Sequence, residues 1–314
     1  MSTPIALISK LPVAQQQMWV RKLEAILPHE KFALASALDD DLKAGIEIAI
    51  VADPDLELVK SFSKLKWVHS LWAGVENLVE IAKQQKFDIV RLVDPALANT
   101  MAEAVLTWVL YLHRKIPTYV TQQQQKIWKQ HAYTATSQCK VGLLGLGELG
   151  KASAHRLASN GFEVLGWSQS KKILSNVKSY HGEKGLVEML ELCQIVICLL
   201  PLTKTTRGLV NKKLLEHLPS GASLINFSRG EVVVVKDLLS QLNTNRLAHA
   251  VLDVFEQEPL PKDSELWSNK RISILPHIAA TTNPESAAQI IANNISNFRN
   301  KGSLDEFIDL DRGY

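Results

Sequence analysis

The chain has 314 residues, of which 46% are hydrophobic and 21% are charged, and its formal net charge is +3. This composition excludes disordered and fibrous proteins, and the length suits two domains. The positive charges form no basic block, so nothing favours nucleic acid as a partner. No run of about 18 apolar residues indicates a membrane span, and no signal peptide is evident. We therefore expect a soluble cytoplasmic protein that does not act at a membrane.

Three cysteines, Cys139, Cys193 and Cys198, lie in apolar surroundings and form no CxxC pair. Their odd number and their spacing predict reduced, buried thiols, with neither a disulfide nor a metal site. The glutamine run 122–125 is the one low-complexity stretch, and we interpret it as a solvated helix face without a role.

The first part of the chain alternates short apolar strands with helical patterns. Strands are expected over Pro4–Ser9, Glu47–Ala52 and Trp67–Leu71, and a helix over Val13–Leu27. No phosphate-binding glycine turn occurs in this part. The alternation predicts an α/β unit with a flavodoxin-like parallel sheet.

A second alternation, with stronger strands, begins at Cys139. Six strands are expected, over Cys139–Leu144, Glu163–Trp167, Ile195–Leu200, Ser223–Phe227, Ala248–Val254 and Ile272–Leu275. Because helical patterns connect them, these strands predict a doubly wound parallel sheet of the dinucleotide-binding, Rossmann-like type.

Two apolar helices, expected over Ala96–Leu112 and Pro284–Phe298, flank this second unit. They could carry the chain from one domain to the other and back. We therefore predict an α/β fold of two domains linked by crossing helices. Residues 1–97 and 285–314 would form a discontinuous substrate domain, and residues 98–284 a nucleotide-binding domain inserted into it.

The most informative segment is Val141–Gly150, in which a strand runs into a glycine-rich turn and then into a helix. Gly145 permits a tight turn, Gly147 lets the backbone approach a pyrophosphate, and Gly150 lets the helix pack closely on the strand. The N–H groups of the helix N-terminus would face the anion. The segment therefore predicts a dinucleotide site.

The end of the next expected strand distinguishes NAD from NADP, since an Asp or Glu there accepts hydrogen bonds from the ribose hydroxyls of NAD. Here the strand continues into Ser168, Gln169, Ser170, Lys171 and Lys172, without a carboxylate. Hydroxyl and ammonium groups would attract a 2′-phosphate, so we predict a preference for NADP(H), with NAD accepted less well. The alternative is a solvated turn that happens to be basic.

Three residues suit the reduction of a 2-oxo acid. Arg229, Glu258 and His277 each follow an expected strand, at the sheet edge where ligands bind. In such a reduction the carbonyl oxygen needs a proton donor and the carboxylate needs a planar cation. Each residue alone has an ordinary explanation, as a salt bridge, a loop carboxylate or a packed histidine. Together they favour an active site.

At these motifs the chain resembles the D-isomer-specific 2-hydroxyacid dehydrogenase family, and within it the branch that reduces glyoxylate and hydroxypyruvate. The resemblance covers nearly the whole chain. It is strongest in Val141–Gly150, Leu200–Asn211, Asn226–Val232, Asp253–Pro259 and Pro276–Ala279.

The resemblance implies a role for each residue. His277 would donate the proton in reduction, Glu258 would hydrogen-bond its ring and favour imidazolium, and Arg229 would bind the substrate carboxylate. A loop of the first domain would hold the other side of the substrate in the cleft between the domains, through Trp72, Ala73, Gly74 and Val75. The cofactor would contact Gly145, Gly147, Glu148, Leu149, Gly150, Ser168, Gln169, Ser170, Lys171, Lys172, Leu200, Pro201, Thr206, Phe227, Ser228 and Asp253, the last at the nicotinamide end.

Trp72 departs from many members of the family, which carry a small residue at this position. An indole there would wall off the substrate pocket and favour short acids. The alternative is a tryptophan packed in the core of its domain. We interpret the nearby His69 as structural.

The resemblance therefore implies a reductase that prefers NADPH and converts glyoxylate to glycolate and hydroxypyruvate to D-glycerate. It also implies a homodimer built through the nucleotide domains. Two alternatives stay open. One is a dehydrogenase for another acid, such as 2-ketogluconate, D-lactate or D-3-phosphoglycerate, and the other is a nucleotide-sensing, corepressor-like binding protein.

Overall fold

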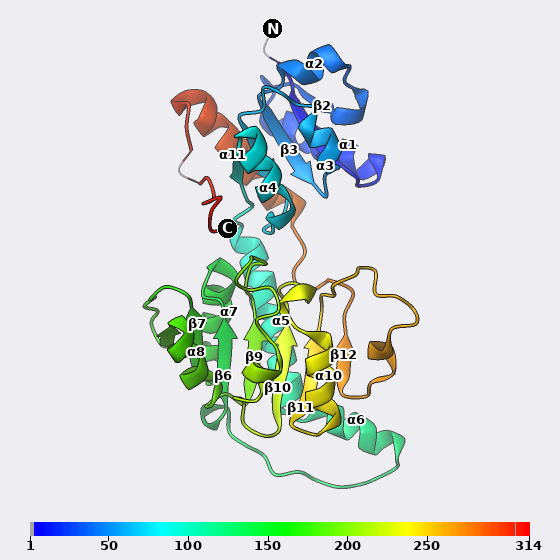
Figure 1. Cartoon of the computed structure of the whole chain (residues 1–314), viewed down its shortest axis with the longest axis vertical. Helices are drawn as coiled ribbons and strands as arrows, with labels where there is room; N and C mark the ends of the chain where they lie inside the picture. The colour runs from blue at the N-terminus through cyan, green and yellow to red at the C-terminus, as the bar shows by residue number, and fades with distance from the viewer. Residues whose placement is uncertain (1–2, 305) are drawn as a thin grey trace. The chain divides into compact units, whose positions relative to one another are not determined.

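The structure is a computed structural model that describes residues 3–304 and 306–314 (Figure 1). The chain divides into two compact units. Unit 1 is the chain up to Ala96 together with Thr282–Tyr314, and unit 2 is Leu97–Thr281. Each unit is built on its own parallel sheet, so the predicted α/β class with two parallel sheets is confirmed.

Unit 1 contains a parallel sheet with strand order β2-β1-β3-β4-β5, the flavodoxin-like order. Its strands are β1 (Ile5–Ser9), β2 (Phe32–Leu34), β3 (Ile48–Ala52), β4 (Trp67–Ser70) and β5 (Asp88–Val90). Its helices are α1 (Val13–Ile26), α2 (Asp40–Gly45), α3 (Leu56–Lys60), α4 (Glu76–Gln85) and α11 (Pro284–Lys301). The expected strands and the helix after β1 are present, whereas the short edge strands β2 and β5 were not predicted.

The core of unit 1 lies on both faces of this sheet. One face packs against α1 and α11, through side chains such as Leu23 and Ile291, and the other packs against α3 and α4, through Val59 and Leu78. The alternate residues Ile48 and Ala49 of β3 face the two cores, because successive side chains of a strand point to opposite faces. The C-terminal helix therefore completes the fold of the first ninety residues.

Unit 2 contains a parallel sheet with strand order β12-β11-β10-β9-β6-β7-β8. Its strands are β6 (Lys140–Leu144), β7 (Glu163–Ser168), β8 (Lys178–His181), β9 (Ile195–Cys198), β10 (Ala222–Asn226), β11 (Leu247–Leu252) and β12 (Ile272–Ile274). Its helices are α5 (Pro95–His113), which begins at the boundary with unit 1, α6 (Ile116–Gln124), α7 (Glu148–Ser159), α8 (Gly182–Leu190), α9 (Lys212–Leu215) and α10 (Val235–Asn243). The prediction of six strands is wrong, since the described part of the sheet has a seventh, β8, at its edge.

Helices cover both faces of the unit 2 sheet, as Figure 1 shows. Side chains of α5 and α7, such as Val105 and Leu157, pack with Ile225 of β10 on one face. Side chains of α8, α9 and α10 pack with Leu224 on the other. This double covering explains why the strands read as continuous apolar runs.

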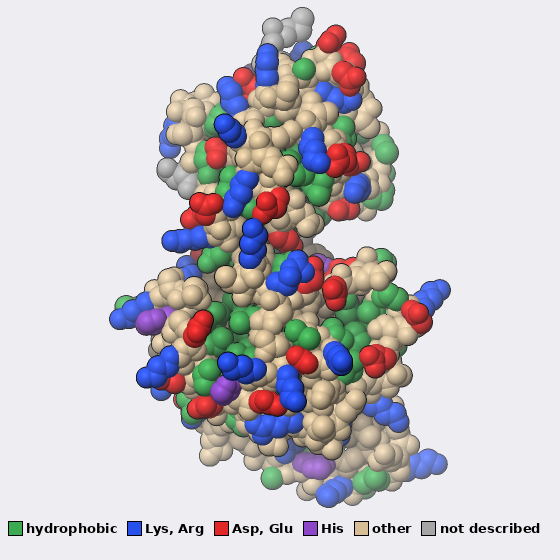
Figure 2. Space-filling view, viewed as in Figure 1, with side chains coloured by type: hydrophobic (Ala, Val, Ile, Leu, Met, Phe, Trp, Pro, Cys, Tyr) green, Lys and Arg blue, Asp and Glu red, His purple; other side chains and the backbone are tan. Residues whose placement is uncertain are grey.

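The surface carries charges of both signs without a one-sided block on the face shown in Figure 2. Within residues 3–304 and 306–314, no helix has the length and apolar character needed to cross a membrane.

Candidate active site

The glycine turn after β6 is built as the sequence pattern requires. Gly145 has φ +104°, a left-handed value that favours glycine, and its N–H donates to the carbonyl of Trp167 at 2.9 Å. A Cβ added at Gly150 would lie 1.9 Å from the Gly145 carbonyl oxygen, so only glycine fits there. A Cβ added at Gly147 would meet no atom within 4 Å, which leaves room for a bound group to approach the backbone. The turn thus fits a dinucleotide pyrophosphate at the N-terminus of α7.

This turn lies where ligands bind in doubly wound sheets. The order of the strands reverses between the neighbours β6 and β9, and the crevice outside the strand ends at such a point is the usual nucleotide site. Leu200 and Pro201 follow β9 on the same side. The Thr206 hydroxyl donates to the Pro201 carbonyl at 2.6 Å and accepts from the N–H of Thr203 at 2.8 Å. Thr206 therefore closes the loop after β9.

The basic loop after β7 reaches back to the glycine turn. Lys172 Nζ donates to the carbonyl of Leu146 at 3.0 Å, which places an ammonium group at the turn itself. The Ser168 side chain is buried, and its hydroxyl donates to the Ser170 carbonyl at 2.7 Å. Gln169, Ser170 and Lys171 are exposed. The Ser168 hydroxyl therefore donates its hydrogen bond inside the loop, whereas the Lys171 side chain is exposed to solvent.

Arg229 lies on a tight turn after β10. Its side chain is half-buried, and Nη1 donates to the carbonyl of Ser228 at 2.7 Å. A Cβ added at Gly230 would lie 2.0 Å from the Phe255 carbonyl carbon, so the turn packs directly against the loop after β11. The side chains of Phe227 and Ser228 are buried, so we expect any cofactor contact of these two residues to come from their backbone.

His277 and Glu258 form a hydrogen-bonded pair. His277 Nδ1 lies 2.8 Å from Glu258 Oε2, while Glu258 Oε1 accepts the N–H of Phe255 at 2.9 Å. A carboxylate can only accept here, so Nδ1 carries the proton and Nε2 is the atom left for proton transfer. His277 has φ +54°, a left-handed value that is uncommon for a residue with a side chain. Such a conformation requires support from its neighbours.

Asp253 provides that support. Its Oδ1 accepts the N–H of Ile278 at 2.7 Å and its Oδ2 accepts the N–H of Ala279 at 2.9 Å. Its carbonyl accepts the N–H of His277 at 2.9 Å. The carboxylate is buried, so Asp253 fastens the segment after His277 to the end of β11. The role expected for it at the nicotinamide end has to be compatible with these two bonds.

The loop of unit 1 that carries the expected substrate residues leads into α4. Among the described residues, the N–H groups of Gly74 and Val75 donate no hydrogen bond, as is usual just before a helix begins. Trp72 is half-buried and packs against the core shared by α1 and α11. Part of its indole therefore serves the core of unit 1, and part remains exposed.

His69 is structural, as expected. It is fully buried, its Nδ1 donates to the Ser70 carbonyl at 2.9 Å, and its Nε2 accepts from the Asn294 amide at 3.0 Å. Burial lowers the pKa of His69 to about 4, so the ring is neutral near pH 7. The side chain ties β4 to α11.

The cysteines contribute no nucleophile. Cys139, Cys193 and Cys198 are free and buried. Burial raises the pKa of Cys139 to about 11 and that of Cys193 to about 12, and it also raises the pKa of Cys198. All three thiols therefore stay protonated near neutral pH. No group of three or more His, Cys, Asp or Glu in the described part of the chain could hold a metal ion.

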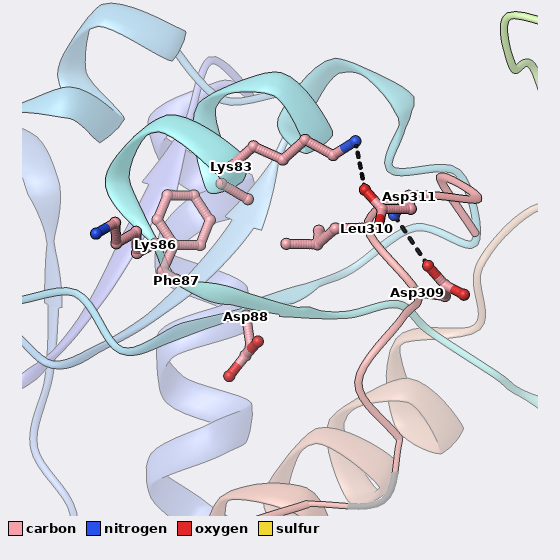
Figure 3. A pocket seen from close by; sticks show the side chains of 8 residues that line it. Lys83, Lys86, Phe87, Asp88, Asp309, Leu310 and Asp311 are labelled. Carbon is pink, nitrogen blue, oxygen red and sulfur yellow. Dashed lines mark hydrogen bonds and ion pairs between the residues drawn. The ribbon is translucent and has the colours of Figure 1, made fainter.

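A surface pocket of about 430 Å³ lies in unit 1, and none of its lining residues belongs to the motifs (Figure 3). Lys83, Asp88, Asp309 and Asp311 are among its lining residues, and Lys83 Nζ pairs with Asp311 Oδ1 at 3.2 Å. The pocket separates the end of α4 from the C-terminal segment. Two of its charged groups pair with each other and none of its residues belongs to the motifs, so we assign it no part in the chemistry.

Comparison with known proteins places these features in one family. The family model for the D-isomer specific 2-hydroxyacid dehydrogenase NAD binding domain matches residues 106–279. The glyoxylate/hydroxypyruvate reductase A of Yersinia enterocolitica is 34% identical over 309 residues, which cover 96% of this chain and 98% of the relative.

Two solved structures have the same fold over the full chain. A D-isomer specific 2-hydroxyacid dehydrogenase from Xanthobacter autotrophicus, in complex with NADPH and MES, is 36% identical and superimposes with a TM-score of 0.92 over 100% of both chains. An NADPH-dependent glyoxylate/hydroxypyruvate reductase from Sinorhizobium meliloti, in complex with NADP and sulfate, is 29% identical. It has a TM-score of 0.88, over 99% of this chain and 100% of the relative.

Proposed function

Because the chain belongs to the D-isomer specific 2-hydroxyacid dehydrogenase family and is an NAD(P)-dependent oxidoreductase, we propose that it reduces glyoxylate and hydroxypyruvate, using NADPH in preference to NADH. The products would be glycolate and D-glycerate. The observation that carries the proposal is the His277–Glu258 pair, with Nδ1 and Oε2 at 2.8 Å. This pair leaves Nε2 of a histidine ready to protonate a carbonyl oxygen.

The residues of unit 2 supply the parts of the reaction in this proposal. Arg229 binds the carboxylate of the 2-oxo acid through its planar guanidinium. A nicotinamide cofactor, when bound, supplies the hydride that the keto carbon receives. His277 donates its Nε2 proton to the carbonyl oxygen, which gives the 2-hydroxy acid. The Glu258 carboxylate stabilises the imidazolium before this transfer, and the same groups act in reverse during oxidation.

The loop before α4 supports a second contact to the substrate. The N–H groups of Gly74 and Val75 are at the N-terminal end of α4, where the helix dipole favours an anion. We propose that they donate to the substrate carboxylate. Trp72, which precedes them, would limit the length of the acid.

A preference for NADPH is supported by the loop after β7. Lys171 is exposed, Lys172 is held at the glycine turn, and no carboxylate occurs among Ser168–Lys172. A carboxylate at this place would repel a 2′-phosphate, whereas the ammonium groups attract it.

We also propose that the protein is a homodimer built through unit 2. The segment after α6 exposes several large apolar side chains, including Ile127 at 49%, Trp128 at 98% and Tyr133 at 68%. Exposed aromatic side chains of this size are typical of protein interfaces. Sedimentation velocity with wild type and Trp128→Ala tests this proposal, and a wild type that sediments as a monomer at micromolar concentration would contradict it. The buried, free cysteines support the proposed cytoplasmic location.

Steady-state oxidation of NADPH and NADH by the purified protein tests the main proposal. The substrates are glyoxylate, hydroxypyruvate, pyruvate and 2-ketogluconate, each with wild type and His277→Ala. We expect the first two substrates and NADPH to give the highest kcat/KM, and His277→Ala to lower kcat by about 10²-fold or more. If another acid is reduced with a higher kcat/KM, that acid replaces glyoxylate and hydroxypyruvate as the proposed substrate. If no acid is reduced, a nucleotide-sensing role is favoured.

A further inference from the structure

Asn226, the last residue of β10, directs its whole amide at the turn that carries Arg229. Its side chain is 1% exposed. Nδ2 donates to the Arg229 carbonyl at 2.9 Å. Oδ1 accepts the N–H of Ser228 at 3.2 Å and the Ser228 hydroxyl at 2.9 Å. One buried amide therefore holds both residues of the turn.

Hydrogen bonds to the neighbouring strand ends fix the backbone at Asn226. Its carbonyl accepts the N–H of Asp253 at 3.1 Å, and the N–H of Phe227 donates to the Cys198 carbonyl at 3.1 Å. The other side of the turn is closed by the contact between Gly230 and the Phe255 carbonyl group. The turn is thus held between the Asn226 amide and the loop that leads to Glu258.

We propose that Asn226 is the positioning residue for Arg229 and so sets the affinity of the site for the substrate carboxylate. This inference rests on the proposed function of Arg229. Asn226 is too deeply buried to touch substrate, and it acts through the backbone of the turn. An amide of this length supplies a donor for the Arg229 carbonyl and an acceptor for the Ser228 groups at once. Without it, these buried polar groups lose their partners and the turn can shift.

Asn226→Ala tests the proposal directly. We expect the KM for glyoxylate to rise about 10- to 100-fold, because a shift of about 1 Å in a substrate-binding group costs that much. The Kd for NADPH, measured by fluorescence titration, should change less than this KM, because Phe227 and Ser228 are only part of the expected cofactor contacts.

Asn211→Ala is a matched control in the same unit. Asn211 Nδ2 donates to the Gly208 carbonyl at 3.0 Å and Oδ1 accepts the N–H of Leu214 at 3.2 Å, so this amide also fastens a turn. It lies at the start of α9 and holds no residue of the candidate site. We expect this variant to lower stability while the KM for glyoxylate stays within twofold of wild type. Equal KM values in the two alanine variants would overturn the proposal.

Asn226→Asp separates positioning from simple loss of packing, since it keeps the shape of the side chain. When protonated, the carboxyl group can still donate to the Arg229 carbonyl, whereas the ionised form would repel it. Because burial raises the pKa of a carboxyl group, we expect the ratio of the KM of this variant to that of wild type to be lowest at acidic pH, measured at pH 5.5. The ratio should rise several-fold by pH 8.5. A ratio that is high but independent of pH would contradict the hydrogen bond to Arg229.

Hydrogen exchange makes the inference independent of turnover. Deuterium uptake measured by mass spectrometry on a peptide that spans residues 227–232 should increase in Asn226→Ala but not in Asn211→Ala. If the wild type reduces no 2-oxo acid, the proposed function fails, and this exchange result still decides whether Asn226 holds the turn. Unchanged uptake in Asn226→Ala would overturn the inference even in an active enzyme.

Discussion

Glu258 connects His277 to the loop after β11, because its two oxygens have different partners. Oε2 lies 2.8 Å from His277 Nδ1 and Oε1 accepts the N–H of Phe255 at 2.9 Å. The ring therefore has one fixed tautomer and orientation before any substrate binds. Since the turn of Arg229 packs against the same loop at Phe255, His277 and Arg229 share one support.

Glu258→Gln keeps the shape of the side chain but has only one acceptor for the two donors, the Phe255 N–H and the His277 ring, and it removes the carboxylate charge beside that ring. We expect kcat for glyoxylate reduction to fall about 10- to 1,000-fold with little change in the Kd for NADPH. Stopped-flow and steady-state kinetics measure both. Glu256→Gln, a change at an exposed neighbour, is the control and should behave as wild type. Similar kinetics for the two variants would exclude a role for Glu258 in proton transfer.

Gly147→Ala and Gly150→Ala should separate cofactor binding from folding. The added methyl at Gly147 meets no protein atom within 4 Å, so we expect stability within about 0.5 kcal/mol of wild type and weaker NADPH binding. At Gly150 the methyl would lie 1.9 Å from the Gly145 carbonyl oxygen, so the variant should be strongly destabilised. Urea unfolding and NADPH titration check this, and unweakened binding by Gly147→Ala would count against a pyrophosphate at the turn.

The lysines after β7 should control the choice of cofactor. Lys171→Glu combined with Lys172→Glu places two carboxylates beside the expected 2′-phosphate, so the KM for NADPH should rise at least tenfold while that for NADH changes little. Lys184→Glu, on an exposed face of α8, is a control for a reversal of charge at a single lysine. The prediction fails if the ratio of the two KM values stays at its wild-type level.

Trp72→Gly should widen the range of acids that the enzyme accepts. The expected result is an increase in kcat/KM for longer 2-oxo acids relative to glyoxylate, because an indole no longer limits the pocket. The indole also packs on the core of unit 1, so some loss of stability should accompany the change. Relative rates with glyoxylate, pyruvate and 2-ketogluconate measure it, and an unchanged ratio would leave Trp72 with a packing role alone.

Two buried histidines should lower the free energy of unfolding at acidic pH. Burial lowers the pKa of His69 and that of His249 to about 4, below the value of 6.5 in an unfolded chain. The unfolded state therefore binds more protons between these values, so stability is full above about pH 6.5 and falls as the pH decreases toward 4. From pH 7 to pH 5 we expect a loss of about 2 kcal/mol for each histidine.

Urea unfolding at pH 5 and pH 7 measures this loss. His249 Nε2 hydrogen-bonds the Ser273 hydroxyl at 2.9 Å, and His249→Gln should remove its share of the pH dependence. His29→Gln, at an exposed histidine, is the control and should leave the slope as in wild type. If all three proteins lose the same stability between the two pH values, burial of His249 is not the cause.

Strands with long apolar runs were predictable from the sequence, whereas short edge strands were not. β6 and β10 are covered on both faces, so their residues are almost all apolar and the pattern is evident. β8 reads Lys-Ser-Tyr-His and lies at the edge of its sheet, where only pairing with β7 makes it a strand. β2 and β5 are three residues long and depend in the same way on their neighbours.

The burial of a side chain in the glutamine run 122–125 was also not predictable from the sequence pattern. Gln122 was expected to face solvent, and this is wrong. It is buried, and its amide donates to the carbonyl of Lys129 at 3.0 Å and lies 2.7 Å from His131 Nε2. The partners of Gln122 come from the irregular segment after α6, for which no periodic pattern exists.

The sequence by itself determined the glycine turn, because the conformation of Gly145 and the close contact of Gly150 require that residue type wherever the motif occurs. It also indicated which side chains could transfer a proton or bind a carboxylate. Only the tertiary structure decided how those side chains are held. The bonds from Asp253 to the segment after His277 depend on the ends of β11 and β12, which neighbour each other in the sheet. Sequence spacing does not encode which strand ends become neighbours, since hydrogen bonding and packing over the whole sheet set the strand order.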